Sequence, residues 1–125
     1  MAESSLIKKL VIKPNNKVAI VNAPEGYRLE NLPDGVQVSD QLDGEFDVIH
    51  AFYIKQADLE PQIPALKSHL KAGGILWVSY PKAGKLGTDL KRDPLYDLML
   101  KHGVQANSQI AIDDTWSALR FKIVG

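Results

Sequence analysis

Residues 46–54 read FDVIHAFYI and residues 75–82 read ILWVSYPK, and these two runs decide the fold of the chain. Both are rich in β-branched and aromatic residues and poor in charge, as is typical of strands covered on both faces. Between them, four apolar residues recur at helical spacing and predict one buried helix face: Leu59, Ile63, Leu66 and Leu70. A strand, a helix and a second strand form a βαβ unit, whose strands are parallel and whose crossover is right-handed.

Residues with known positional preferences mark the ends of the predicted helix. Asp58 is a candidate N-cap, and Pro61 and Pro64 fall near the first turn, where a missing N–H costs least. Gly73 and Gly74 supply the positive φ that stops a helix. The sequence therefore predicts a helix that begins near Asp58 and ends before these glycines.

The segments on the N-terminal side continue the pattern of buried strands. A strand is predicted at residues 17–21 and a short one at residues 36–38. Residues 28–35 are too few and too interrupted for the helix that a regular βαβ unit places there. Ser4 or Ser5 is expected to cap a short helix ahead of the first strand.

The C-terminal side is predicted to contain one helix and a hairpin. Asp93 and Pro94 mark the start of the helix, and Gly103 marks its end. Residues 104–112 and 116–124 alternate loosely between apolar and polar, which indicates two antiparallel strands.

The whole pattern predicts an α/β three-layer sandwich with a mostly parallel, Rossmann-like sheet that ends in an antiparallel hairpin. At 125 residues the chain is long enough for one domain with a real core and too short for two, so residues 1–125 are expected to form a single domain.

Composition excludes several classes of function. Fifteen basic residues balance 15 acidic ones, so no overall field draws the chain to nucleic acid or to an anionic membrane. The absence of cysteine excludes disulfides, thiolate metal sites and a cysteine nucleophile, and it fits a reducing cytoplasm. No apolar run approaches the ~20 residues of a spanning helix, and residues 1–5 are polar. We expect a cytoplasmic protein with no nucleic-acid or membrane partner, and its oligomeric state stays open.

Several motifs resemble those of class I S-adenosylmethionine-dependent methyltransferases. In those enzymes an FDVV strand, a helix, an LKPGG turn and a further strand precede a two-strand antiparallel end. Here residues 46–50 read FDVIH and residues 70–78 read LKAGGILWV, in the same order and ahead of the predicted hairpin. From residue 17 to the end, the resemblance implies a methyltransferase-like fold.

Nearly the whole chain is also similar to a small bacterial domain family of unknown function, which has a shortened methyltransferase-like fold. The motifs that carry this resemblance are KKLVIKP (8–14), NAPEGY (22–27), YPK (80–82) and DDTWSAL (113–119). The resemblance implies an architecture and no established activity.

The chain departs from the methyltransferase pattern at the turn after its first predicted strand. A methyltransferase has Gly-x-Gly-x-Gly there, so that the backbone can approach the methionine part of the cofactor. This chain has Asn22, Ala23, Pro24, Glu25 and Gly26, with one glycine and a proline that fixes φ and removes a donor. The helix that should follow is nearly gone, together with its N-terminal amides and dipole. The sequence thus disfavours ordinary S-adenosylmethionine binding and leaves the identity of any cofactor open.

Ligands of an open parallel sheet bind beyond the carboxyl ends of the strands, where the strand order reverses. The predicted ligand site therefore comprises the turn of residues 22–26, Asp40 and Lys82, and the exit at residues 52–55 is also of interest. Asp40 lies where related folds place an acid that accepts hydrogen bonds from ribose hydroxyls, and Lys82 could neutralise an anionic ligand. Each also has a simpler explanation: a shaped connection for the turn, a turn residue for Asp40 and a solvated lysine for Lys82.

The histidines are expected to have structural roles. His50 lies inside a predicted strand, where a hydrogen-bonded core residue is the expected state, and His69 and His102 fall near helix C-termini, where a positive charge is favoured. No histidines and carboxylates have metal-ligand spacing, so we predict no metal site.

Two hypotheses of function follow. The first is a non-catalytic, methyltransferase-like module that binds a small molecule or another protein, because the glycine turn and the first helix are missing. The second is a small enzyme, either a methyltransferase or a nucleotide-binding enzyme, that uses Asn22, Glu25, Asp40 and Lys82 at the carboxyl edge of the sheet. Whether the chain is an enzyme stays open.

Overall fold

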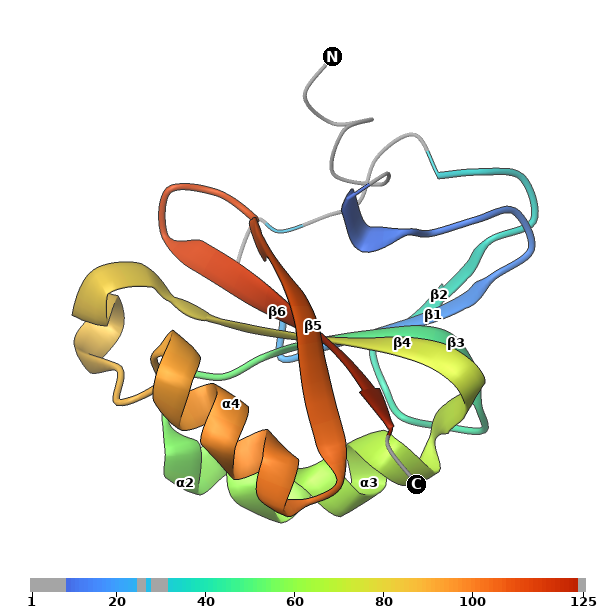
Figure 1. Ribbon diagram of the computed structural model, residues 1–125. Helices are drawn as coiled ribbons and strands as arrows, with labels where there is room; N and C mark the ends of the chain where they lie inside the picture. Colours follow the sequence, from blue (N-terminus) through green and yellow to red (C-terminus); the bar gives the residue numbers. More distant parts are fainter. Residues whose placement is uncertain (1–8, 25–26, 28–31, 124–125) are drawn as a thin grey trace.

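Six strands form one sheet in the order β2-β1-β3-β4-β6-β5 (Figure 1). The structure is a computed structural model that describes residues 9–24, 27 and 32–123. The strands are β1 (Lys17–Val21), β2 (Gln37–Ser39), β3 (Phe46–Phe52), β4 (Leu70–Pro81), β5 (Val104–Ala111) and β6 (Trp116–Ile123). β1 pairs in parallel with β2 and β3, and β3 pairs in parallel with β4. β6 is antiparallel to both β4 and β5, so the predicted mostly parallel sheet with a C-terminal hairpin is confirmed.

The crossover from β3 to β4 winds in three short pieces: α2 (Gln56–Leu59), the 3-10 helix η1 (Glu60–Gln62) and α3 (Ile63–Ser68). Pro61 and Pro64 lie in this winding, and each lacks the N–H that an uninterrupted α-helix uses. Three residues of the predicted apolar face are buried in this winding: Leu59, Ile63 and Leu66. The fourth, Leu70, is also buried, but it is the first residue of β4 and not part of the helix.

Both predicted ends of this helix were wrong. The winding begins at Gln56, whose backbone N–H donates to Asp89 Oδ1 at 2.8 Å, so Asp58 is inside the first turn and caps nothing. At the other end α3 stops at Ser68, and Gly73 and Gly74 lie within β4. An acceptor 33 residues away sets the start, which local capping preferences do not reveal.

The two glycines serve the sheet instead. The register between β3 and β4 shifts between Phe46 and Val48, opposite the stretch that contains Gly73 at φ 76°. A Cβ on Gly74 would lie 3.0 Å from the Asp47 carbonyl oxygen and 2.9 Å from that of Lys71. Gly74 therefore allows a close approach of two backbones at the irregularity.

Between β4 and β5 the chain forms the 3-10 segment η2 (Lys82–Gly87) and the helix α4 (Arg92–Lys101). The N-cap position of α4 is Lys91 rather than the predicted Asp93, which lies in the first turn. The helix ends before Gly103, as predicted, and this glycine has φ 78°. The predicted inward residues are buried: Leu95, Leu98 and Met99.

The two faces of the sheet are covered by different kinds of structure. All the labelled helices lie on one face, and the segment that leads into β1 crosses the other (Figure 1). Leu10 and Ile12 of that segment are buried, and the Leu10 carbonyl accepts a hydrogen bond from Trp77 Nε1 at 2.9 Å. Ser4 and Ser5, the predicted caps of an N-terminal helix, lie outside the described residues. The described part of the chain begins at residue 9, and residues 9 and 10 are helical.

The connection from β1 to β2 has no helix in its described part, residues 22–24, 27 and 32–36. The prediction concerned residues 28–35, of which 28–31 lie outside the described residues, and residues 32–35 are not helical. None of the helices among the described residues combines the length and apolar character that crossing a membrane requires.

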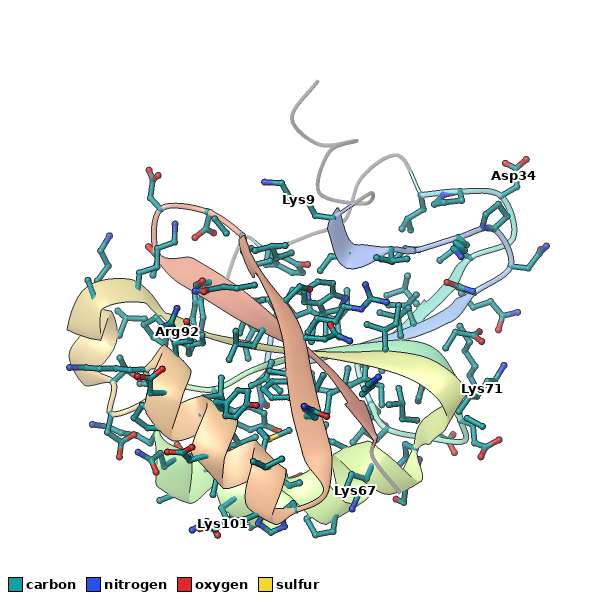
Figure 2. The ribbon with its side chains drawn as sticks, in the orientation of Figure 1. Lys9, Asp34, Lys67, Lys71, Arg92 and Lys101 are labelled. Carbon is teal, nitrogen blue, oxygen red and sulfur yellow. The ribbon has the colours of Figure 1, made fainter. Side chains whose placement is uncertain are left out.

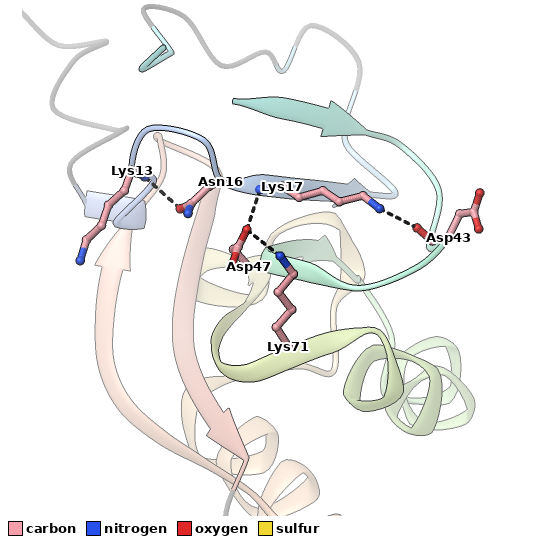
Figure 3. A network of polar contacts seen from close by, with 6 residues as sticks. All are labelled: Lys13, Asn16, Lys17, Asp43, Asp47 and Lys71. Carbon is pink, nitrogen blue, oxygen red and sulfur yellow. Dashed lines mark hydrogen bonds and ion pairs between the residues drawn. The ribbon is translucent and has the colours of Figure 1, made fainter. Parts of the chain in front are cut away.

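A polar network fixes the edge of the sheet where the parallel strands begin (Figure 3). Asp47 Oδ2 accepts a hydrogen bond from the Lys17 backbone N–H at 2.8 Å and lies 3.4 Å from Lys71 Nζ. Lys17 Nζ in turn donates to the Asp43 carbonyl at 3.3 Å. These contacts tie β1, β3 and β4 together at their amino ends, and the clefts described below open at the opposite edge.

Candidate functional site

The strand order reverses between β1 and β3. From β1 the chain moves to β2 on one side, and from β3 it moves to β4 on the other. The connections diverge at such a point and leave space beyond the carboxyl ends of the strands, which is where ligands of open α/β sheets bind.

One open cleft of ≈ 670 Å³ lies at the carboxyl ends of β1 and β2, and we call it the β1–β2 cleft. Its lining residues are Ile20, Ala23, Tyr27, Leu32, Val38, Ser39 and Asp40. The Ser39 hydroxyl is engaged locally, because it donates to the Gln41 carbonyl at 3.0 Å and accepts from the Gln41 N–H at 3.2 Å. The Asp40 carboxylate is exposed and makes no hydrogen bond or ion pair with the described residues, so it is available to a ligand.

A second cleft of ≈ 680 Å³ lies at the carboxyl ends of β1 and β3, and we call it the β1–β3 cleft. It is lined by Val21, Asn22, Pro24, Phe52, Tyr53, Ile54, Asp58, Gln62, Leu86 and Trp116. The Tyr53 hydroxyl is, among the described residues, the one buried side-chain polar atom without a hydrogen-bond partner. Burial, with a smaller contribution from the Asp58 charge, raises the pKa of Tyr53 to about 12, so this hydroxyl keeps its proton at neutral pH.

The structure divides the predicted site residues among three clefts. Ala23 and Asp40 line the β1–β2 cleft together, whereas Asn22 and Pro24 line the β1–β3 cleft. Glu25 and Gly26 lie outside the described residues. Lys82 lines neither of these clefts; it borders a third, beside Tyr80, and its backbone N–H donates to the Thr115 carbonyl at 2.8 Å.

The turn after β1 has a backbone unlike a glycine-rich loop. Asn22 adopts φ 60°, the left-handed conformation that glycine favours and that asparagine tolerates. Pro24 follows two residues later and has no N–H to offer. In its described part, residues 22–24 and 27, the turn therefore presents side chains and few free amides to a ligand.

His50 is a hydrogen-bonded core residue, as predicted. It is 1 % exposed, its Nδ1 lies 3.0 Å from the Tyr27 hydroxyl, and its Nε2 lies 2.6 Å from Ser79 Oγ. Burial lowers the pKa of His50 to about 3, so the imidazole is neutral at physiological pH. Burial also raises the pKa of Tyr27, with a smaller effect of the Asp113 charge.

The pairing of Ser79 with His50 does not make a nucleophile. Ser79 is 0 % exposed and lines none of the clefts described here, so no substrate can reach its hydroxyl. The network instead connects the interior to the surface through Tyr27, which bonds His50 and also lines the β1–β2 cleft.

Sequence reasoning missed the roles of Tyr27 and Tyr53. Tyr53 immediately follows β3, and its place in the strand exit at residues 52–55 was the available signal. Tyr27 likewise ends the segment 22–27 that follows β1, but its contacts could not be predicted, because His50 and Phe52 lie more than 20 positions away in the sequence. Trp116, which draws attention in the sequence, is 7 % exposed and packs edge-on against Phe52.

The described residues contain no group of three or more His, Cys, Asp or Glu side chains arranged to hold a metal ion.

Comparison with known proteins relates this geometry to one class. No protein-family model and no curated protein matches the sequence. Among solved structures, the chain is similar to the ribosomal protein L11 methylase from Lactobacillus delbrueckii subsp. bulgaricus, with a TM-score of 0.60, 18% identity and coverage of 98% of this chain and 77% of that one. It is similar to a SAM-dependent methyltransferase from Aquifex aeolicus, with a TM-score of 0.69, 13% identity and coverage of 98% and 89%. A TehB-like SAM-dependent methyltransferase from Corynebacterium glutamicum gives a TM-score of 0.65, 11% identity and coverage of 97% and 86%.

The fold is therefore that of the class I S-adenosylmethionine-dependent methyltransferases, in a shortened form. At these identities the likeness concerns the fold alone. The predicted methyltransferase-like, Rossmann-like architecture is confirmed.

Proposed function

We propose that this chain is a non-catalytic, methyltransferase-like module that binds a small molecule containing a nucleoside in the β1–β2 cleft. The observation that carries the proposal is the composition of this cleft. Apolar side chains and the ring of Tyr27 line it, and the exposed carboxylate of Asp40 lies at the end of β2.

This composition suits a flat ring attached to a sugar. A base can pack against Ile20, Leu32 and the Tyr27 ring, since small-molecule sites are mostly apolar with a few placed polar groups. A carboxylate that follows a strand of a doubly wound sheet accepts hydrogen bonds from ribose hydroxyls in related folds. Adenosine is the first nucleoside to test, because the similar solved structures are of SAM-dependent enzymes.

Two features support binding without catalysis. The turn after β1 carries Asn22 and Pro24, so in its described residues few backbone amides can hold the methionine part of S-adenosylmethionine. His50, a natural candidate for proton transfer, is buried, neutral and committed to Tyr27 and Ser79.

Titration calorimetry of the full chain with adenosine, S-adenosylhomocysteine and S-adenosylmethionine tests the proposal. We expect similar affinities for the three compounds, because only their shared adenosine part is held, and a stabilisation of about 2.7 kcal/mol at a hundredfold excess over Kd. Asp40→Asn should weaken binding roughly tenfold, and Asp97→Asn, on the exposed face of α4, is the matched control. No heat and no thermal shift with any nucleoside would overturn the proposal.

A second function, a small enzyme, is favoured by the β1–β3 cleft. The unpartnered, protonated Tyr53 hydroxyl beside Asp58 is a donor that a bound substrate could use. This hypothesis predicts that S-adenosylmethionine binds much more tightly than adenosine, and that Tyr53→Phe weakens binding while Asp40→Asn has less effect. Methyl transfer to a small acceptor, followed by release of S-adenosylhomocysteine, would establish it.

A further inference from the structure

A third cleft, of ≈ 530 Å³, opens at the carboxyl end of β4, between the β5–β6 hairpin and the start of α4. Its lining residues are Tyr80, Pro81, Lys82, Ala83, Lys91, Arg92, Gln109 and Ser117. Three of these are basic and none is acidic, although the whole chain has equal numbers of basic and acidic residues. We call it the basic cleft.

The positive charges of the basic cleft are largely uncompensated. Lys82 and Lys91 form no ion pair with any residue of the described ranges. Arg92 Nε lies 3.3 Å from Asp93 Oδ1, but both side chains are mostly exposed (65% and 83%), so water weakens this pair. Figure 2 shows Arg92 at the end of α4 that lies beside the hairpin.

The wall of the cleft contains fixed polar groups. Gln109 Nε2 donates to the Tyr80 hydroxyl at 3.0 Å and to Ser117 Oγ at 3.2 Å, and Ser117 Oγ donates to the Ile110 carbonyl at 3.1 Å. Tyr80 is 5 % exposed, and its hydroxyl proton has no acceptor among the described residues. Its oxygen accepts from Gln109, so its proton can be donated to a ligand in the cleft.

The start of α4 adds to the same field. This ten-residue helix has no side-chain cap at its N-terminus, so the N–H groups of Arg92 and Asp93 are available. Pro94 adds no N–H, and the Asp93 carboxylate in the same turn offsets part of the positive end of the dipole. Lys91 and Arg92 lie at this end of the helix and also line the cleft.

We propose that the basic cleft binds the phosphate group of a small phosphate monoester. A dianion compensates several cations at once, guanidinium and ammonium groups both bind phosphate oxygens, and the proton of the Tyr80 hydroxyl supplies a neutral donor. The remaining volume has room for a small organic part. The site shares no lining residue with the β1–β2 cleft, so this inference does not rest on the proposed function.

Titration of the full chain with inorganic phosphate and with glycerol phosphate, followed by amide NMR at constant ionic strength, tests the proposal. We expect saturable shifts at Lys82, Arg92 and the Gln109 side-chain amide. Lys82→Gln and Arg92→Gln should each weaken binding about tenfold. Lys101→Gln and Lys122→Gln remove the same charge from exposed positions outside the cleft and should leave the affinity unchanged.

A second variant separates the geometry from the charge. Tyr80→Phe keeps every cation and should still weaken phosphate binding several-fold, with the circular dichroism spectrum unchanged. Three results would overturn the proposal: shifts that do not saturate, equal losses in the control and cleft variants, or succinate binding as tightly as phosphate.

Discussion

His50 lies at the centre of the longest buried polar chain described above, between the Tyr27 hydroxyl and Ser79 Oγ. A neutral imidazole has one donor and one acceptor nitrogen, and here each nitrogen has a partner. The ring also stacks on Phe52, with centroids 4.3 Å apart. Protonation would place a second donor and a charge in this packed environment, which explains why the pKa of His50 lies near 3.

This pKa predicts how stability depends on pH. Between about pH 6.5 and about pH 3 the unfolded chain binds a proton at His50 and the folded chain does not, so the free energy of unfolding decreases as the pH falls through this window. The contribution of His50 to the slope of the unfolding free energy against pH approaches about 1.4 kcal/mol per pH unit below the pKa of histidine in the unfolded chain. Urea unfolding at several pH values measures this slope, and His50→Gln should make it shallower by that amount.

A direct measurement guards against a variant that folds poorly. The imidazole signals of His50 in the unsubstituted protein should show no titration by NMR down to about pH 5. Titration of His50 near pH 6.5 would contradict the buried network.

At the scale of elements, the irregular start of β4 is the most constrained feature. Gly74 lies where a Cβ would meet two carbonyl oxygens and Leu70 Cδ1, all within 3.0 Å. Gly73 has φ 76° and nothing within 4 Å of a built Cβ. Gly74 is therefore required because there is no space for a side chain, and Gly73 is favoured because its φ is positive.

The two glycines should respond differently to substitution. Gly74→Ala should destabilise the fold by ~1–3 kcal/mol, because backbone must shift to admit the methyl group. Gly73→Asn should cost less, because asparagine tolerates a positive φ and its side chain meets no neighbour. Thermal or urea unfolding measures both, and equal losses would show that the close approach at Gly74 is not the limiting contact.

The order and direction of the elements could be predicted from the sequence because apolar periodicity records them. The runs at residues 46–54 and 75–82 became β3 and part of β4, and the hairpin lies where it was expected. The end of α4 before Gly103 could be predicted, but the ends of the crossover helix could not. The start of α2 depends on Asp89, and its continuation depends on how Pro61 and Pro64 are accommodated.

The candidate site was predicted as a single pocket at the carboxyl edge of the sheet, and the structure divides its residues among three clefts at that edge. Asp40 follows β2 and Lys82 follows β4, and in the sheet order β1 and β3 lie between these two strands. Three strand spacings separate their ends by roughly 14 Å, which a linear sequence does not reveal. Lys82 instead lines a cleft together with Lys91 and Arg92, because the chain between β4 and α4 returns to the same edge of the sheet.

On the scale of the whole molecule, the cover of the sheet is unequal. Helices pack on one face, while the other is sealed largely by a few residues before β1, among which Leu10 is 0 % exposed. Leu10 belongs to the apolar cluster of that face, together with Val18, Val48 and Trp77. Among the described residues, this short segment covers the face of the sheet that the labelled helices leave open.

This arrangement predicts that the segment is part of the cooperative unit. Leu10→Ala should lower the free energy of unfolding by ~2–5 kcal/mol, as expected for truncation of a fully buried leucine. Lys9→Ala, which changes an exposed neighbour, should have little effect. Coincident transitions by far-UV circular dichroism and by fluorescence would confirm one unit, and an early fluorescence transition would show that the segment detaches separately.

The positions of the two tryptophans divide the intrinsic fluorescence of the protein into two reporters. Trp77 is 1 % exposed, bonded to Leu10 and absent from the linings of the clefts described above, so its emission registers whether the N-terminal segment is docked. Trp116 lines the β1–β3 cleft, so its emission registers what enters that space. Replacing either tryptophan with phenylalanine isolates the emission of the other. Intrinsic fluorescence can then report separately on folding and on ligand binding in the β1–β3 cleft, without an attached dye.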